Sequence, residues 1–307
     1  MTNQEIRQLF QDIRVWQQGG KRAPHKPLLL LLAISRAIQG EVTITEYSAI
    51  DSPLKSLLQK FGPSSGPASR HYPFWHLGTD FDGTLWQLDG PKEILERPPG
   101  KTPTLTELRD LNIRGGLAPK IRERLQRDIR LAAEVIGILL YTHFPATLHE
   151  DILAEVEIPA RFILPPVHEF DRQEYRRDST VRQRILKAYN YRCCICNHDL
   201  RIADRFVGLE AAHIKWVQMK GPHEIRNGLA LCSTHHKMFD YGVFTIDPKA
   251  HYVLFSQNAN ASGPTAEKLL SYHGAPIISP QKDSHRPASA YLEWHRDEVF
   301  KKPARGV

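Results

Sequence analysis

Apolar patterns typical of buried helices dominate the first half of the chain. The string HKPLLLLLAISRAI (25–38) is apolar on all sides and has Pro27 in its first turn, which predicts a buried helix. The string TEYSAIDSPLKSLLQKFG (45–62) predicts a second helix. The strongest helical pattern repeats apolar residues three and four apart, at Ile121, Leu125, Ile129, Ala132, Val135, Ile136 and Leu139.

Shorter apolar runs between these helices favour strands. YPFWHL (72–77) and TLWQL (84–88) are separated by the turn formers TDFDG (79–83), so we expect a small hairpin. The segment NIRGG (112–116) is expected to be a loop that precedes the strongest helix. Residues 1–148 are therefore predicted to form a mostly helical domain with a small sheet.

The pattern changes after residue 148. Residues 149–178 mix acids, prolines and short apolar runs without a sustained period, which is typical of a linker. Beyond it, a helical pattern (179–190), a strand pattern (206–214) and the helix-like CSTHHKMFD (232–240) indicate a second domain over 179–307. The predicted fold class is α+β, in two domains with a linker between them.

Composition narrows the choice of partner and compartment. Lys and Arg number 41 against 34 Asp and Glu, a net charge of +7 that suits a polyanion. The charged N-terminal segment does not look like a secretory signal, and the longest apolar run, Leu28 to Ile34, is far shorter than a membrane span of about 20 residues. We expect a soluble protein in the cytoplasm of a bacterial or archaeal cell, with no membrane partner.

Four cysteines are too few for a disulfide framework, and three of them crowd into the string CCIC. Cys193 and Cys196 form a C-x2-C pair, and Cys232 with His235 forms a C-x2-H pair further on. Together they supply the Cys3His set of a structural Zn²⁺ site. The alternative is a pair of buried free cysteines beside an unrelated histidine. Cys194 is expected only to pack in the core.

Between these two pairs, a strand ends in His213, a loop contains Asn227, and a helix carries His236. This arrangement resembles the HNH nuclease family, whose three signature positions these residues occupy. The resemblance covers about sixty residues, and it implies a ββα-metal fold and the hydrolysis of DNA phosphodiester bonds.

The chemistry of that reaction assigns roles to these residues. A neutral imidazole with a pKa near 6.5 can deprotonate water, so His213 is the expected general base. His236 and Asp240 lie four apart on one helix face and can hold one divalent cation, Mg²⁺ or else Mn²⁺, Ni²⁺ or Co²⁺. The resemblance implies that Asn227 braces the loop and orients the base.

The position before the base departs from the family pattern. Many members have an acid or a histidine there that binds the metal, whereas this chain has Ala212. Glu210 lies on the same strand face and is the expected replacement ligand, directly or through water. Its alternative role is to pair with a basic side chain.

The strings HKPLLLLLAI (25–34), FGPSSGPASRHYPFWHL (61–77), DGTLWQL (82–88) and IRGGLAPKI (113–121) follow one another ahead of the nuclease motif. In this order they resemble the sulfur-binding domain of phosphorothioate-dependent (type IV) restriction endonucleases. The resemblance spans most of residues 20–145, and it implies that double-stranded DNA with sulfur in its backbone is the partner.

Sulfur on phosphorus is larger and more weakly hydrated than oxygen, so its reader should offer an apolar cup beside cationic donors. Arg70, His71, Tyr72 and Pro73 could supply both, whereas Phe74 and Trp75 are expected to be core residues. Arg114, Gly115 and Gly116 could form a second contact loop in which the backbone approaches DNA closely. The alternative for that segment is an ordinary turn before a helix.

Three functions compete at this point. The first is a modification-dependent restriction endonuclease. The second is an HNH endonuclease of other purpose, in repair or in a mobile element. The third, a DNA-binding protein without catalysis, is disfavoured by the intact set of His213, Asn227 and His236. The sequence leaves a homodimer open.

Overall fold

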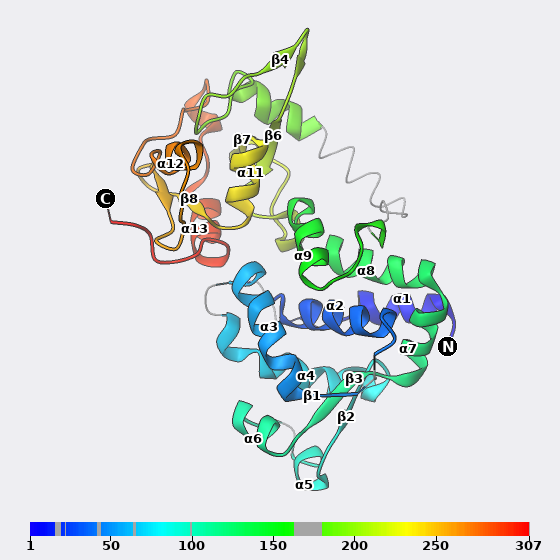
Figure 1. Ribbon diagram of the computed structural model, residues 1–307. Helices are drawn as coiled ribbons and strands as arrows, with labels where there is room; N and C mark the ends of the chain where they lie inside the picture. The colour runs from blue at the N-terminus through cyan, green and yellow to red at the C-terminus, as the bar shows by residue number, and fades with distance from the viewer. Residues whose placement is uncertain are drawn as a thin grey trace. The chain divides into compact units, whose positions relative to one another are not determined.

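Figure 1 shows a computed structural model of the protein, whose chain forms two compact units. These units are Met1–Pro165 and Pro166–Val307. The structure describes residues 1–15, 20–21, 23–41, 44–63, 66–98, 100–162 and 180–306.

The first unit is mostly helical and surrounds one buried helix, α2 (His25–Ile38). Helices α3, α4, α7 and α8 all pack against α2, and Leu28 to Leu31 are fully buried. This explains why the string is apolar on every side. The helices are α1 (Asn3–Gln11), α2, α3 (Tyr47–Phe61), α4 (His71–Thr79), α5 (Lys92–Leu95), α6 (Leu105–Asp110), α7 (Pro119–Arg127), α8 (Ile129–His143) and α9 (His149–Glu155).

A small antiparallel sheet completes the first unit. Its order is β1 (Thr45–Glu46), β3 (Arg114–Leu117), β2 (Trp86–Asp89), so β3 is the central strand. Gly115 lies opposite both Thr45 and Leu88. A Cβ atom on Gly115 would lie 2.6 Å from Cζ of Phe74 and 2.9 Å from Nε1 of Trp86. The bare backbone therefore lets two large aromatic side chains pack against the sheet.

Two of the local predictions for this sheet are wrong. YPFWHL is not a strand: it lies in α4, where Pro73 sits in the first turn and Phe74 and Leu77 face the core three residues apart. NIRGG is not a loop, because its last three residues begin β3. The strand predicted from TLWQL is β2, but it pairs with β3 and not in a hairpin with YPFWHL.

The strongest predicted helix is two helices, α7 and α8. Asp128 has the non-helical angles φ −117° and ψ 88°, and its side chain accepts a hydrogen bond from the backbone N–H of Leu131 at 3.0 Å. An aspartate that caps a helix in this way begins a new one. Ile129, the apolar residue that seemed to continue the period, is 67% exposed.

The first unit also extends further than expected. The sequence places a linker from residue 149, but α9 begins there and buries Ile152 and Leu153. A short 3-10 helix at Ala160–Phe162 follows. The linker prediction was therefore wrong for residues 149–162, and residues 163–178 lie outside the described part of the chain.

The second unit is built around a ββα arrangement. Strand β6 (Leu209–His213) pairs antiparallel with β7 (Gly228–Cys232), and α11 (Ser233–Asp240) follows directly and packs on both strands. Residues 180–188 are helical, in agreement with the sequence pattern, and Ile185 packs in the same core. The other elements are β4 (Arg201–Ile202), β5 (Arg205–Phe206), β8 (Phe244–Ile246), β9 (Val253–Phe255), α12 (Pro264–Leu270) and α13 (Ser289–Glu298).

Candidate nuclease site and DNA-binding surface

The Cys3His set converges on one point. Cys193 and Cys196 lie in the turn after residues 180–188, Cys232 ends β7, and His235 lies in the first turn of α11. Their ligand atoms all lie within 4.8 Å of one another. Sγ of Cys196 is 3.9 Å from Sγ of Cys232. Tetrahedral ligands about 2.3 Å from one zinc ion lie about 3.8 Å apart, so the residues fit Zn²⁺.

Cys194 stays outside this set. Its side chain is fully buried in the hydrophobic core of the second unit, and its backbone N–H donates to the carbonyl of Ala230 at 2.8 Å. Burial raises the pKa of the Cys194 thiol well above its ordinary value. A neutral, buried thiol is a packing residue, as the sequence analysis expects.

His213 is the last residue of β6, opposite Gly228 at the start of β7. Its ring packs edge-to-face on the ring of His223, with 5.2 Å between centroids. The next residue, Ile214, donates its backbone N–H to the carbonyl of Asn227 at 2.9 Å. The general-base candidate therefore lies at a fixed strand end.

Asn227 is fully buried and braces the loop that follows β6. Its Oδ1 accepts from the N–H of Lys215 at 2.8 Å. Its Nδ2 donates to the carbonyls of Lys215 and Pro222, each at 3.0 Å. These bonds close the loop across twelve residues, a geometry that fits the bracing role expected from the family resemblance.

His236 lies on α11 between two carboxylates. Its Nδ1 is 2.6 Å from Oε2 of Glu210, and its Nε2 is 3.2 Å from Oδ2 of Asp240. The other oxygen of Asp240 accepts from Nε1 of Trp216 at 3.1 Å. The sequence analysis did not find this contact of Trp216, because a lone tryptophan in a loop carries no spacing signal.

The same surroundings set the charge of His236. Burial of the imidazole disfavours its charged form, but the carboxylates of Asp240 and Glu210 outweigh burial and raise the pKa of His236 to about 10. Negative potential of this strength at one imidazole also attracts a divalent cation, which would displace a proton. His236 and Asp240 thus fit the metal-ligand role expected of them.

The candidate sulfur-binding residues fall in two places. Arg70 immediately precedes α4, and its Nε donates to Oδ1 of Asp51 at 2.6 Å. Arg109 pairs with the other oxygen of the same carboxylate. The Arg70 side chain is only 12% exposed, so this residue first ties the start of α4 to the buried carboxylate of Asp51 on α3.

Tyr72 is the exposed residue of the first group, with 46% of its surface accessible to solvent. Its ring is near two imidazoles, with 4.2 Å to His71 and 6.1 Å to His76 between centroids, and it is nearly parallel to the ring of His76. Pro73 is buried, and so are Phe74 and Trp75, which are core residues as expected. Sequence analysis missed His76, although its spacing of four from Tyr72 would have placed both on one helix face.

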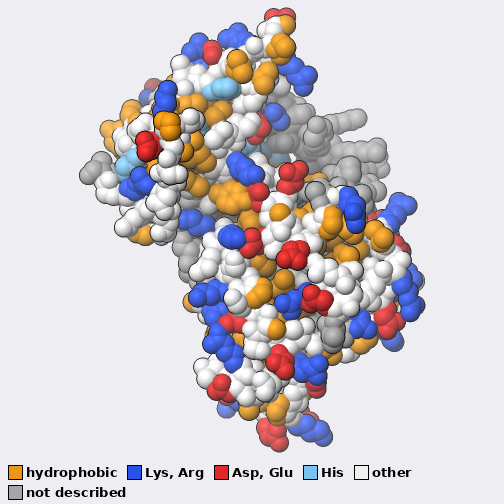
Figure 2. Space-filling model, viewed as in Figure 1, with side chains coloured by type: hydrophobic (Ala, Val, Ile, Leu, Met, Phe, Trp, Pro, Cys, Tyr) orange, Lys and Arg blue, Asp and Glu red, His pale blue; other side chains and the backbone are white. Residues whose placement is uncertain are grey.

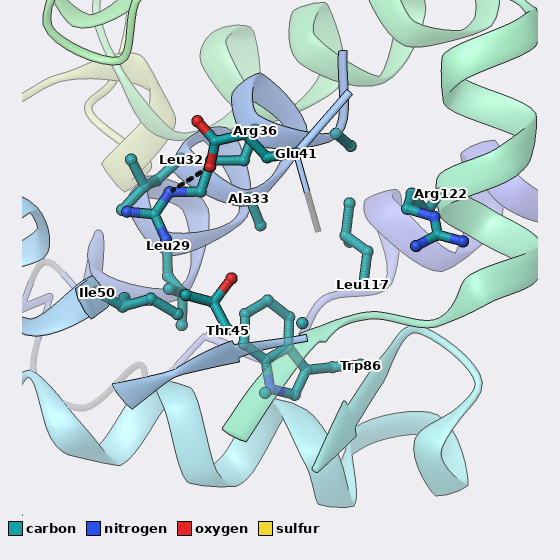
Figure 3. Close-up of a pocket in the computed structure, with 13 residues that line it drawn as sticks. Leu29, Leu32, Ala33, Arg36, Glu41, Thr45, Ile50, Trp86, Leu117 and Arg122 are labelled. Atoms are coloured by element: carbon teal, nitrogen blue, oxygen red, sulfur yellow. Dashed lines mark ion pairs between the residues drawn. The ribbon is translucent and has the colours of Figure 1, made fainter. Parts of the chain in front are cut away.

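Arg114, Gly115 and Gly116 form the second group, on β3. Arg114 is 45% exposed, and it lies 3.6 Å from a carboxylate oxygen of Asp89. Both glycines are buried, and both line a small open cavity. In Figure 3, Leu29, Leu32 and Ala33 of α2 face Trp86 and Leu117 of the sheet across this cavity, and the Arg36–Glu41 ion pair stands at its edge.

Surface charge is mixed on the face that Figure 2 shows, where Lys and Arg side chains are interspersed with Asp and Glu. No helix among the described residues is both long and apolar enough to cross a membrane.

Family models match both units. The model described as "ScoMcrA-like, DNA sulfur-binding domain" matches residues 3–160, which is just over half of the chain. The chain belongs to this ScoMcrA-like family. The model described as "HNH endonuclease" matches residues 193–247. The ScoMcrA-like chain therefore carries an HNH endonuclease domain after its sulfur-binding domain, and its three HNH signature residues all lie within the second match.

Solved structures similar to this ScoMcrA-like chain include two sulfur-binding domains in complex with phosphorothioated DNA. That of ScoMcrA is 28% identical, with 49% of this chain and 96% of that chain covered and a TM-score of 0.43. That of SprMcrA is 23% identical, with 52% and 95% covered and a TM-score of 0.42. The structure of the type IV phosphorothioation-dependent restriction endonuclease ScoMcrA is 27% identical over 53% of this chain, which spans 36% of that longer one, with a TM-score of 0.42. No curated protein matches the chain.

Proposed function

We propose that this protein is a modification-dependent restriction endonuclease that binds double-stranded DNA through a backbone phosphorothioate and hydrolyses phosphodiester bonds nearby. One observation carries the proposal: a single chain joins a ScoMcrA-like sulfur-binding domain to an HNH domain with His213, Asn227 and His236 in place. Such an enzyme meets foreign DNA in the cytoplasm, which is where we place it.

Hydrolysis would begin with His213. As a neutral imidazole at the end of β6, it takes a proton from the attacking water. Asn227 keeps the following loop closed, so the base retains its position. His236 and Asp240 would hold Mg²⁺ or another divalent cation, whose Lewis acidity stabilises the charge that develops on the phosphoryl and leaving oxygens. The products would have 5′-phosphate and 3′-hydroxyl ends.

The Cys3His set would hold a structural Zn²⁺ ion that does not take part in hydrolysis. It ties the turn at Cys193 to the start of α11, the helix that carries His236. Because that helix begins at the zinc set and ends at Asp240, the structural ion would also fix the position of the catalytic one.

Recognition of sulfur would centre on Tyr72. Burial and the nearby charge of Arg70 lower the pKa of His71, and burial and the charge of Lys26 lower that of His76. Both imidazoles are therefore neutral near pH 7, and they add apolar ring surface next to the exposed Tyr72 ring. A weakly hydrated sulfur loses little by entering such surroundings. Arg114, with its half-exposed guanidinium, would contact the DNA backbone.

A binding titration tests this proposal. Matched duplexes with and without one phosphorothioate are titrated at rising salt, because phosphate neutralisation weakens with salt whereas apolar contact with sulfur does not. The preference for sulfur should persist at salt that removes binding to the unmodified duplex. Tyr72→Ala should erase the preference, and Leu111→Ala, which removes another exposed apolar side chain of the same unit, should leave it intact.

Equal binding to both duplexes at every salt concentration would favour the second function, an HNH endonuclease of other purpose. Cleavage of unmodified DNA at the rate of modified DNA would have the same meaning. Sedimentation of the protein with and without DNA would show whether it acts as a homodimer.

A further inference from the structure

The imidazole of His236 contacts a different carboxylate at each of its two nitrogens. Glu210, on β6, approaches Nδ1 at 2.6 Å. Asp240, one turn further along α11, approaches Nε2 at 3.2 Å. A metal ion takes the lone pair of one ring nitrogen, and the other nitrogen then carries hydrogen. Only one of the two carboxylates can therefore share an ion with His236.

The three side chains do not converge on one point in the described part of the chain. There, the only set of three or more Cys, His, Asp or Glu ligand atoms within 4.8 Å of one another is Cys3His. Glu210 and Asp240 lie at opposite edges of the ring, so a single ion cannot use both carboxylates together with one imidazole nitrogen.

Glu210 is already engaged through both of its oxygens. Oε1 accepts from the hydroxyl of Ser233 at 2.9 Å, and Oε2 contacts Nδ1 of His236. A separation of 2.6 Å is that of a charge-assisted hydrogen bond. Since Ser233 and His236 both belong to the first turn of α11, Glu210 fixes the imidazole relative to the start of the helix that carries it.

Asp240 has the geometry of a ligand. Two ligands that each lie about 2.1 Å from one ion stand about 3 Å apart, which is close to the 3.2 Å between Oδ2 of Asp240 and Nε2 of His236. The hydrogen bond from Trp216 holds the other oxygen, Oδ1. Oδ2 faces the imidazole of His236.

We infer that Glu210 is a positioning residue for the catalytic metal site: it holds the hydrogen of His236 on Nδ1 and so presents Nε2, together with Oδ2 of Asp240, as the protein ligands. The inference rests on the proposed metal-dependent cleavage. It replaces the role expected from sequence, in which Glu210 was itself a ligand in the place left by Ala212.

Metal binding tests the inference without cleavage. The full chain with its structural zinc is titrated calorimetrically with Ni²⁺, and Glu210→Gln, Glu210→Ala and Asp240→Asn are compared with the unchanged protein. Loss of a partner that orients a ligand costs about 10- to 100-fold in metal affinity. Glu210→Ala should show that loss with the stoichiometry unchanged. Glu210→Gln, which keeps an acceptor oxygen, should bind more tightly than Glu210→Ala, and Asp240→Asn should bind most weakly.

A spectroscopic measurement identifies the ligand nitrogen. With ¹⁵N-labelled histidine and a second equivalent of Zn²⁺, long-range ¹⁵N–¹H spectra should show hydrogen on Nδ1 of His236 and metal on Nε2. Metal on Nδ1, or Glu210→Gln binding as weakly as Asp240→Asn, would overturn the inference, as would Glu210→Ala binding like the unchanged protein. Retention of the structural zinc in each variant separates these outcomes from unfolding. Failure of the proposed function is seen separately, as loss of the preference for phosphorothioated DNA.

Discussion

Nε of Arg70 donates to Oδ1 of Asp51 at 2.6 Å, and this ion pair joins the start of α4 to the middle of α3. The hydroxyl of Tyr47 donates to the same oxygen at 2.8 Å. Asp51 is 7% exposed and Arg70 12%. Tyr72 follows Arg70 by two residues, so the pair fixes the helix turn that presents the exposed tyrosine.

Arg70→Ala should therefore act on stability. Removal of one partner of a buried ion pair destabilises a protein by about 3 kcal/mol. The matched control is Arg114→Ala, whose pair with Asp89 is exposed and should be worth less than about 1 kcal/mol. Denaturant unfolding of the full chain, followed through the transition of the first unit, measures the loss of stability in both variants. Equal stabilities of the two variants would contradict the structural role of Arg70.

The same carboxylate gives the first unit a pH dependence. Burial alone would raise the pKa of Asp51, but hydrogen bonds from Arg70, Arg109 and Tyr47 outweigh burial and lower it to about 2, from 3.8. A lowered pKa in the folded state stabilises the fold above the unfolded pKa, and that stability is lost as the pH falls. About 2 kcal/mol should disappear between pH 4 and pH 2.

The measurement is the free energy of unfolding across that window. Asp51→Asn should lower stability at neutral pH and flatten its dependence between pH 4 and pH 2. A variant with the same acid profile as the unchanged protein would remove Asp51 as the origin of this dependence.

Two glycines of the first unit should respond in opposite directions to alanine. Gly115→Ala places a methyl group 2.6 Å from Cζ of Phe74 in the packed face of the sheet, and overpacking of this kind costs about 1–3 kcal/mol. Gly137 lies in the middle of α8, where the nearest neighbour of an added Cβ would be Cδ2 of Tyr141 at 4.0 Å. Gly137→Ala should stabilise the unit by about 0.5–1 kcal/mol, because alanine favours the helix. Thermal melts of both variants test this: a melting temperature that is unchanged in Gly115→Ala would show that the packing of Phe74 does not require a glycine there.

The segments predicted correctly from sequence are those whose signal is local. The buried helix 25–38 and the strand that ends in His213 each carry their pattern within a few neighbouring residues. α4 was mistaken for a strand because Tyr72, Phe74 and Trp75 favour strands intrinsically, whereas their burial on a helix is set by packing against α2 and the sheet.

The parts that sequence could not supply depend on distant partners. The sequence offers Arg70 as a cationic donor for DNA, and only the fold brings Asp51, nineteen residues earlier, against it. Glu210 seemed to fill the place of a missing ligand, yet its hydrogen bond to His236 spans twenty-six residues. In both cases the residue type was informative, but the contact that the side chain makes is one that no spacing encodes.

Zinc content should distinguish two adjacent cysteines. Cys193→Ser removes a zinc ligand and should unfold the second unit, because structural zinc contributes folding energy directly. Cys194→Ser should keep the metal and lose only about 1–3 kcal/mol, the cost of burying a hydroxyl. Metal analysis should find one zinc per chain in the unchanged protein and in Cys194→Ser. A well-folded, zinc-free Cys193→Ser would show that the four residues do not form a structural site.

His213→Ala should separate catalysis from folding. The imidazole lies at the end of β6. If it is the general base, as we propose, its loss should slow cleavage by about 10²- to 10⁴-fold. Zinc content, the melting profile and binding to phosphorothioated duplex should stay unchanged, because the base contributes to the transition state and not to the fold.

Asn227→Ala is the contrasting variant. Its amide makes three hydrogen bonds to the loop backbone, so both cleavage and stability should fall, the latter by about 3 kcal/mol. Added imidazole should restore part of the activity of His213→Ala and none of that of Asn227→Ala. If His213→Ala cut modified DNA at the unchanged rate, the proton would have to leave the water by another route and His213 would not be the base.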